Sequence, residues 1–156
     1  MNYNDFKVSF EKLIRFYTQG EFINELTDAK IVFFENTGAI DEARSDYNLR
    51  MYQFYEWYFL TRPMKSYMKT PLQVCGMHRD LRLSDMDKST IRVIEDTQKH
   101  RVYEYLKTKG EKLILKDLLA DKKIEVQKCD LVFGFDSKEF FQARTVEING
   151  DLFFLN

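Results

Sequence analysis

The sequence predicts an α+β protein: an N-terminal helical half packed on a C-terminal small β-barrel or curved sheet of five antiparallel strands. Two observations support this fold class. Apolar residues recur at three- and four-residue spacing up to about residue 98, whereas short alternating segments with turn signals follow it. No repeat or low-complexity linker separates the halves, so we expect subdomains 1–98 and 99–156 to share contacts.

Three helices are expected in the first part of the chain. The first covers residues 4–19 and ends at Gly20, and the second follows it and ends near Gly38. A third spans about residues 40–60, since Pro63 disfavours helical geometry in the residue before it.

Two capping patterns predict further helices. Thr70 and Pro71 are typical of an N-cap and first helical position, and Gly76 keeps that helix short. Ser84 with Asp87 three residues later resembles a capping box ahead of a helix that ends near Thr97.

The strands begin after residue 98. Residues 102–115 form a hairpin around a Lys-Gly-Glu turn, and residues 123–128 alternate as a third strand. The last two strands lie in FFQARTVEINGDLFFLN and are joined at Asn149-Gly150, a strong turn dipeptide. Closing five short strands into a barrel removes their exposed edges.

Composition excludes several classes of protein. The 156 residues are 44% hydrophobic with a net charge of −1, which favours neither disorder nor nucleic acid as a partner. Neither an apolar leader nor a run of about 18 apolar residues occurs, so we expect a cytoplasmic protein without a membrane partner. Cys75 and Cys129 lack metal-ligand spacing, and we interpret both as reduced thiols.

One part of the chain resembles a known group of proteins. The segment FYEWYFLTRP, the following TPL, and the stretches LILKDLLADKKIEV and FFQARTVEINGDLFFL are similar to poorly characterised bacterial proteins, some with a SEC-C zinc motif. The resemblance covers about residues 54–156 and implies a helix-then-barrel layout and a bacterial origin. The cysteine-rich zinc tail of the SEC-C members is missing, and the resemblance transfers no catalytic residues.

Six aromatic residues crowd the eight positions 52–59. On a helical wheel most of them share one broad arc typical of a core-facing helix. That arc contains Tyr47, Met51, Tyr52, Phe54, Tyr55, Tyr58 and Phe59. Trp57 instead lies on the polar side, where it covers the junction with the β half, anchors a partner or stacks on a ligand. The predicted partner-binding residues are Trp57, Arg50, Gln53 and Arg62.

Residues 99–128 contain nine Lys and Arg against five Asp and Glu. Small barrels bind single-stranded nucleic acid through aromatic residues in a basic groove. The alternative site therefore consists of Tyr103, Tyr105, Lys107 and Lys109. The excess of basic residues is small, and lysines on strands also protect sheet edges from aggregation. Nucleic acid is therefore a less favoured partner than another protein.

Candidate catalytic residues are few. His78 and His100 lie 22 positions apart without an evident nucleophile or metal partner, and we interpret both as surface or boundary residues. The stretch MHRDLRLSD, residues 77–85, has arginines suited to phosphate but no glycine-rich cradle, which favours a solvated loop. Asp117 and Arg144 are predicted to form a structural ion pair in the barrel.

The sequence therefore favours a non-enzymatic protein-binding or adaptor module without metal or cofactor, with its recognition surface in a groove between helices and barrel. A nucleic-acid or nucleotide-binding module is the first alternative. A small enzyme whose site is assembled only in three dimensions is the second.

Overall fold

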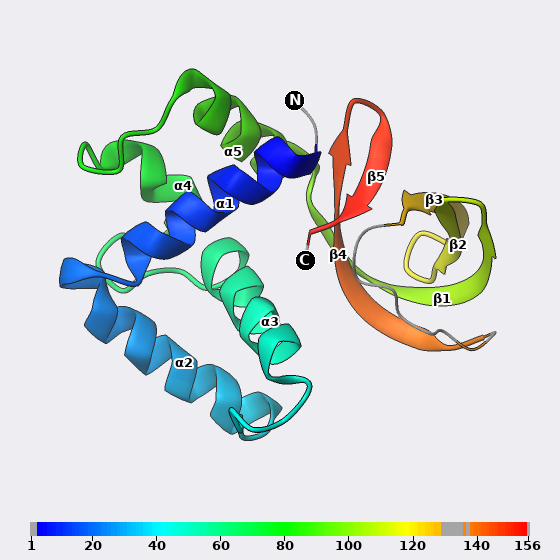
Figure 1. The fold of residues 1–156 in the computed structure, drawn as a ribbon, viewed down its shortest axis with the longest axis horizontal. Coiled ribbons are helices and arrows are strands. Elements are labelled where there is room, and N and C mark those ends of the chain that lie inside the picture. The colour runs from blue at the N-terminus through cyan, green and yellow to red at the C-terminus, as the bar shows by residue number, and fades with distance from the viewer. Residues whose placement is uncertain (1–2, 129–135, 137, 156) are drawn as a thin grey trace. The chain divides into compact units, whose positions relative to one another are not determined.

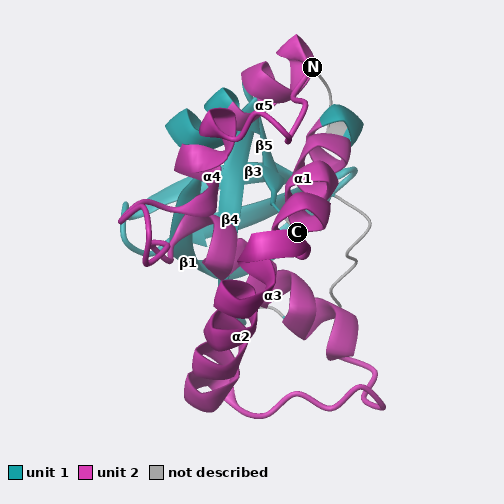
Figure 2. Ribbon diagram, turned by 90° about the vertical axis from the view of Figure 1, so that its left-hand side faces the viewer, with its two compact units in different colours: residues 1–5, 92–156 teal, residues 6–91 magenta. Residues whose placement is uncertain are grey.

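The computed structural model describes residues 3–128, 136 and 138–155, and Cys129 lies outside them. Its helices precede its strands along the chain, as predicted (Figure 1). Tertiary contacts group the chain into two compact units, one of residues 6–91 and one of the described residues in 1–5 and 92–156 (Figure 2). The divisions fall inside the first helix, after residue 5, and inside the last helix, after residue 91.

The helical unit contains elements close to those predicted. They are α1 (Tyr3–Tyr17), η1 (Gly20–Phe22), α2 (Ile23–Thr37), α3 (Tyr47–Leu60), α4 (Pro71–Val74), η2 (Cys75–Met77) and the first part of α5 (Asp85–Thr97). The third helix begins at Tyr47 rather than near residue 40. Asp41 accepts a hydrogen bond from the backbone N–H of Ala43, and such a side-chain turn competes with helix formation.

Both predicted caps are present. Thr70 and Gln73 form a reciprocal capping box at the start of α4. Ser84 and Asp87 do the same for α5: the Asp87 N–H donates to Ser84 Oγ at 3.1 Å, and the Ser84 N–H donates to Asp87 Oδ2 at 2.9 Å.

Aromatic rings fill the interior of the helical unit. Phe59 of α3 meets Phe10 at 5.4 Å and Tyr17 at 5.6 Å, both from α1 and both edge-on. On another side of α3, Phe54 meets Phe33 of α2 at 5.7 Å. The three helices therefore share a core centred on α3.

The barrel consists of β1 (Lys99–Lys109), β2 (Lys112–Asp117), β3 (Lys122–Gln127), β4 (Phe140–Ile148) and β5 (Asp151–Phe154). The strand order is β1-β2-β3-β5-β4, closed by pairing of β4 with β1. The strands therefore form a closed five-stranded barrel. One element of the prediction needs correction, because β3 and β5 pair in parallel whereas the other four pairs are antiparallel.

Alternation along the strands directs one set of side chains into the barrel. Its buried core is Tyr103, Leu113, Leu115, Val126 and Phe154. The β4–β5 turn uses the predicted dipeptide, and Asn149 and Gly150 both have positive φ, at 54° and 86°. These turn angles match the right-handed twist of the paired strands.

Candidate functional site

A cleft of about 480 Å³ opens on the helical unit between α1 and α3. The two helices lie next to each other in Figure 1. The Phe10–Phe59 and Tyr17–Phe59 ring contacts join them. Its lining comes from these two helices: Glu11, Ile14, Arg15, Asn48, Met51, Tyr52 and Tyr55. The core residue Phe59 thus packs the helix of one wall against the helix of the other.

The α3 wall carries amphipathic side chains on one helical face. Asn48, Met51, Tyr52 and Tyr55 follow one another at three- and four-residue intervals, which places them on the same side of the helix. Tyr52 is 51% exposed, and Tyr55 is half-buried with its ring 6.3 Å from that of Phe59. Burial raises the pKa of Tyr55, and the neighbouring Tyr47 makes a smaller contribution in the same direction. The Tyr55 hydroxyl therefore stays protonated and can donate a hydrogen bond.

The α1 wall supplies Ile14 and a loosely associated pair of opposite charges. The Arg15 guanidinium lies 3.9 Å from the Glu11 carboxylate, beyond hydrogen-bond distance, and the Arg15 side chain is 78% exposed. Such an exposed pair contributes little to stability. Both charged groups are therefore accessible at the rim of the cleft.

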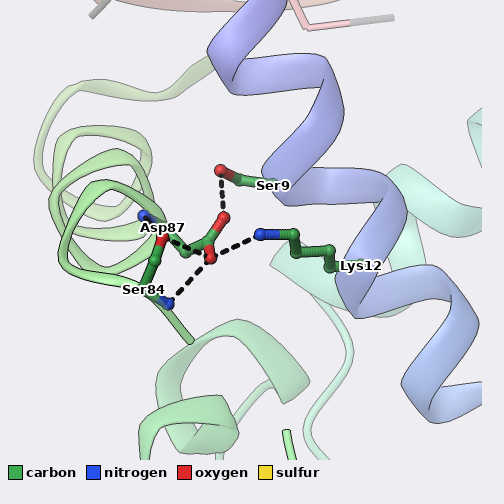
Figure 3. Close-up of polar contacts among 4 residues, drawn as sticks. All are labelled: Ser9, Lys12, Ser84 and Asp87. Carbon is green, nitrogen blue, oxygen red and sulfur yellow. Dashed lines mark hydrogen bonds and ion pairs between the residues drawn. The ribbon is translucent and has the colours of Figure 1, made fainter. Parts of the chain in front are cut away.

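A buried carboxylate on α5 holds α1 in place (Figure 3). Asp87 accepts hydrogen bonds from Ser9 Oγ at 2.8 Å and from Lys12 Nζ at 2.7 Å. Ser84 supplies a third side-chain donor, with its Oγ 2.7 Å from Asp87 Oδ2. Although burial by itself raises the pKa of Asp87, the bonds from Lys12, Ser84 and Ser9 outweigh it and hold the pKa well below its usual range. Ser9 and Lys12 lie on α1 within a turn of the cleft residues Glu11 and Arg15, so this node orients that wall.

The predicted partner-binding patch lies elsewhere, on the side of α3 that contacts α2. The Trp57 ring lies 5.3 Å from that of Phe33, and Arg50 Nη2 donates to the carbonyl oxygens of Thr37 and Gly38 at 3.0 and 2.8 Å. Arg62 pairs with Glu25 at 3.1 Å in a largely buried contact.

These contacts give Arg50 and Arg62 partners within the helical unit. Arg50 donates to the carbonyls at the C-terminal end of α2, and Arg62 pairs with Glu25 of the same helix. Their role in partner binding stays a prediction. Trp57 is half-buried against α2, and Gln53 is exposed. The predicted inward position of Tyr52 is wrong, because its side chain is exposed and lines the cleft.

The residues of the alternative nucleic-acid site differ in their exposure to solvent. Tyr103 is 1% exposed, and its hydroxyl hydrogen-bonds with that of Thr145 at 3.1 Å, so it cannot stack on a base. Tyr105 is half-buried with its hydroxyl 2.9 Å from that of Thr108, whereas Lys107 and Lys109 are exposed. The predicted tyrosine platform is therefore wrong in the case of Tyr103, because strand alternation directs that residue inward.

Small five-stranded barrels that bind oligonucleotides use the face formed by their second and third strands. Here the lysines near that face have acidic neighbours. Lys112 lies 3.2 Å from Glu125 and Lys116 lies 2.8 Å from Asp121. These pairs reduce the positive potential expected from the count of basic residues.

Asp117 and Arg144 each contact other residues near them. The Asp117 carboxylate accepts the backbone N–H groups of Leu119 and Ala120, both at 3.0 Å, and lies 4.0 Å from Arg101. Arg144 donates to the side-chain oxygen of Gln98. Both residues are buried, and the ion pair between them stays a prediction.

The histidines occupy separate places. His78 is half-buried among Phe16, Tyr17, Phe22 and Tyr67, at ring distances of 5.0 to 5.7 Å. His100 is on β1 opposite Arg144, and burial, followed by the Arg144 charge, lowers its pKa. In the loop that begins at Met77, Arg79, Asp80 and Arg82 are exposed. Among the described residues, no group of three or more His, Cys, Asp or Glu is placed to hold a metal ion.

Sequence reasoning missed the cleft. Glu11, Ile14, Arg15 and Asn48 were not candidates, and Met51, Tyr52 and Tyr55 were assigned to the core. The available signal was the width of the apolar arc on α3, which is larger than one neighbouring helix covers.

Comparisons with known proteins give no match. No family model matches the chain, and no curated protein or solved structure does so. The resemblance to bacterial helix-and-barrel proteins therefore stays a prediction. Over the described ranges, none of the helices combines the length and apolar character needed to span a bilayer.

Proposed function

We propose that the protein is a non-enzymatic protein-binding module that holds a segment of its partner in the cleft between α1 and α3. The observation that carries this proposal is the accessible row of Met51, Tyr52 and Tyr55 on one face of α3. Tyrosine, methionine and arginine are enriched where proteins bind one another, and Arg15 stands at the rim.

The chemistry of the lining supports a binding role over a catalytic one. Tyrosine offers a large rigid surface with a polar tip, and methionine adapts its shape to the bound side chain. The cleft's charged groups, Glu11 and Arg15, lie on successive turns of the exposed face of α1, 3.9 Å apart and of opposite sign. An arrangement of this kind recognises a surface without activating a nucleophile.

The test is capture that depends on the cleft. The protein is immobilised and exposed to a native lysate beside a Tyr52→Ala/Tyr55→Ala variant and an Ile31→Ala control, whose apolar side chain is exposed on α2. We expect a partner that the wild type and the control retain and the cleft variant loses. Truncating one tyrosine anchor costs about 2 kcal/mol, or roughly a thirty-fold weaker Kd.

Circular dichroism of each variant verifies that the helices are intact. A partner retained equally by the cleft variant would overturn the proposal, as would the absence of any protein specific to the wild type.

A further inference from the structure

We propose that two neighbouring loops of the helical unit form a second docking surface, which binds an acidic segment of a partner protein that also carries apolar side chains. The loops are residues 64–69 and 77–82, and they lead into α4 and out of η2 (Figure 1). This methionine surface shares no residue with the cleft between α1 and α3, so the inference goes beyond the proposed function.

A ring contact holds the two loops side by side. The Tyr67 ring lies 5.5 Å from the His78 ring and at 88° to it. The His78 ring in turn packs against that of Phe22 at 5.0 Å, which anchors both loops to the aromatic core of the helical unit. Met68 and Met77 are the chain neighbours of these two contacting residues, so they belong to the same surface.

The loops display large apolar side chains to solvent. Met68 is 79% exposed and Met77 is 68% exposed, more than any other large apolar side chain in the described part of the chain. Exposed apolar side chains that gather in one place mark interaction surfaces. Methionine and tyrosine are both enriched at such surfaces, and the thioether chain of methionine adapts its shape to a partner.

The backbone at Met68 is in an unfavourable conformation. Its φ is 53°, in the left-handed region, where Asn and Asp are far more common than methionine. Two backbone bonds impose this turn: the Met64 N–H donates to the Lys69 carbonyl oxygen, and the Met68 N–H donates to the Met64 carbonyl oxygen, both at 2.9 Å. The loop thus holds an apolar side chain in water at a cost in backbone energy, which indicates a use for that side chain.

Positive charge predominates around these apolar groups. The two loops contain four basic residues and one acidic residue, namely Lys65, Lys69, Arg79, Arg82 and Asp80. Lys65 pairs with Asp28 of α2 at 2.9 Å. The other three basic side chains are exposed, and they form no ion pair with any residue that the structure describes. A partner of complementary charge is therefore acidic, and the arginine forks suit its carboxylates.

The combination of charge and apolar surface selects among anionic ligands. A small anion such as phosphate would pair with the arginines but leave both methionines in water. A bilayer presents a plane of anionic groups that would repel Asp80, and the Tyr67 ring is held against His78 rather than extended into solvent. A polypeptide can place carboxylates opposite the cations, a backbone N–H opposite Asp80 and apolar side chains on the methionines.

The experiment uses the full chain and three labelled peptide pools of equal length. The first pool alternates Asp or Glu with Leu or Phe. The second replaces the acidic residues by Asn and Gln, and the third keeps them but replaces the apolar residues by Ser. Fluorescence anisotropy measures binding at low and at physiological salt. Vesicles of phosphatidylserine and phosphatidylcholine test the bilayer as the other anionic partner.

We expect the first pool to bind about ten-fold more tightly than either of the others. Met68→Asn/Met77→Gln should weaken this binding by about ten-fold, because it removes the apolar contacts. Asparagine tolerates positive φ, so urea denaturation should show no loss of stability in this variant. The matched control is Met86→Gln, which changes an exposed methionine of α5 and should bind like the wild type.

The charged residues have a separate test. Arg79→Gln/Arg82→Gln should also weaken binding of the first pool by about ten-fold, and the remaining binding should depend less on salt. Arg92→Gln, at an exposed position of α5, is the control and should leave both the affinity and its salt dependence unchanged.

Several outcomes would overturn the inference. They are the absence of binding to the first pool at low salt, equal binding of all pools, binding to vesicles alone, and variants of the methionine surface that bind like the wild type. Failure of this inference is distinguishable from failure of the cleft, because Tyr52→Ala/Tyr55→Ala should bind the first pool like the wild type. A loss of that binding in the cleft variant would place the acidic segment in the cleft and contradict the methionine surface.

Discussion

Asp87 shows how one buried carboxylate can organise two helices. It accepts from Ser84 on its own helix cap and from Ser9 and Lys12 on α1 (Figure 3). A buried carboxylate is costly unless it is paired and hydrogen-bonded, and here both conditions are met. The side chain is therefore expected to contribute to stability mainly in its ionised form.

Asp87→Ala should lower the free energy of unfolding by about 2–3 kcal/mol, a value reduced because Lys12 is partly exposed. Urea denaturation at neutral pH measures it. Asp85→Asn is the matched control, since Asp85 is on the same helical turn but fully exposed, and its stability should be unchanged. An equal loss in both variants would contradict the role of the node.

The same residue predicts a dependence on acid. Because the pKa of Asp87 in the folded protein lies below its unfolded value of about 3.9, its contribution is fully present above that pH and is lost as the pH falls towards the folded pKa. Between pH 5 and pH 3 the wild type should lose stability more steeply than Asp87→Ala. Parallel curves would show that another carboxylate dominates.

Two buried tyrosines make opposite predictions. The hydroxyl of Tyr17 donates to the carbonyl oxygen of Pro71 at 3.1 Å, whereas the buried hydroxyl of Tyr58 has no hydrogen-bond partner among the described residues. Tyr17→Phe should cost about 1 kcal/mol, and Tyr58→Phe should be neutral or stabilising. Thermal or urea unfolding of the pair tests this, and a larger loss for Tyr58→Phe would contradict it.

Tyr58 also predicts a response to alkaline pH. Burial of its hydroxyl raises the pKa of Tyr58 to about 12. The Glu25 charge adds to this increase, and the Arg62 charge opposes it. Stability should therefore decrease as the pH rises above about 10, the unfolded value, towards 12. The decrease should be smaller in Tyr58→Phe, which equilibrium unfolding between pH 9 and pH 11 can measure.

At the scale of elements, α3 is used on more than one side. Phe54, Tyr58 and Phe59 are buried, Arg50 and Trp57 contact α2, and the row of Met51, Tyr52 and Tyr55 remains accessible in the cleft. A helix with so wide an apolar arc can pack against two neighbours and still present a binding face.

Arg50 illustrates the contact between α2 and α3. Its guanidinium caps the last carbonyls of α2 and lies 5.4 Å from the centre of the Phe34 ring. Arg50→Ala should lower the free energy of unfolding by about 1–2 kcal/mol, because helix-terminal carbonyls lose a charged donor. Arg44→Ala, in the exposed loop before α3, is the control and should leave stability unchanged in the same denaturation assay.

At the scale of the whole molecule, the barrel is closed by seams of unequal length. Strand β1 pairs with both β2 and β4 over six residue pairs each, whereas the parallel β3–β5 seam has only two, Val126 with Leu152 and Gln127 with Phe153. A side-chain bond from Gln127 to Asp151 at 2.8 Å supports it. Local opening is favoured where few backbone bonds must break.

Amide exchange should therefore be fastest at the β3–β5 seam and slowest along β1. Gln127→Ala should accelerate exchange of the β5 amides while leaving those between β1 and β4 unaffected. Exchange followed by nuclear magnetic resonance tests both statements, and uniform protection around the barrel would show that it opens only as one cooperative unit.

The sequence by itself determined the features that depend on residues close in the chain. The change from helical to alternating period, the Thr70–Gln73 and Ser84–Asp87 caps and the Asn149-Gly150 turn were predictable, because each relies on backbone geometry and hydrogen bonds within about four residues. Only the tertiary structure decided which face of α3 stays accessible and that Arg50 and Arg62 contact α2. It also decided that Lys12 pairs with Asp87 and that β3 pairs with β5 in parallel. Those outcomes join residues far apart in sequence, and they follow from how helices and strands pack, which local periodicity does not encode.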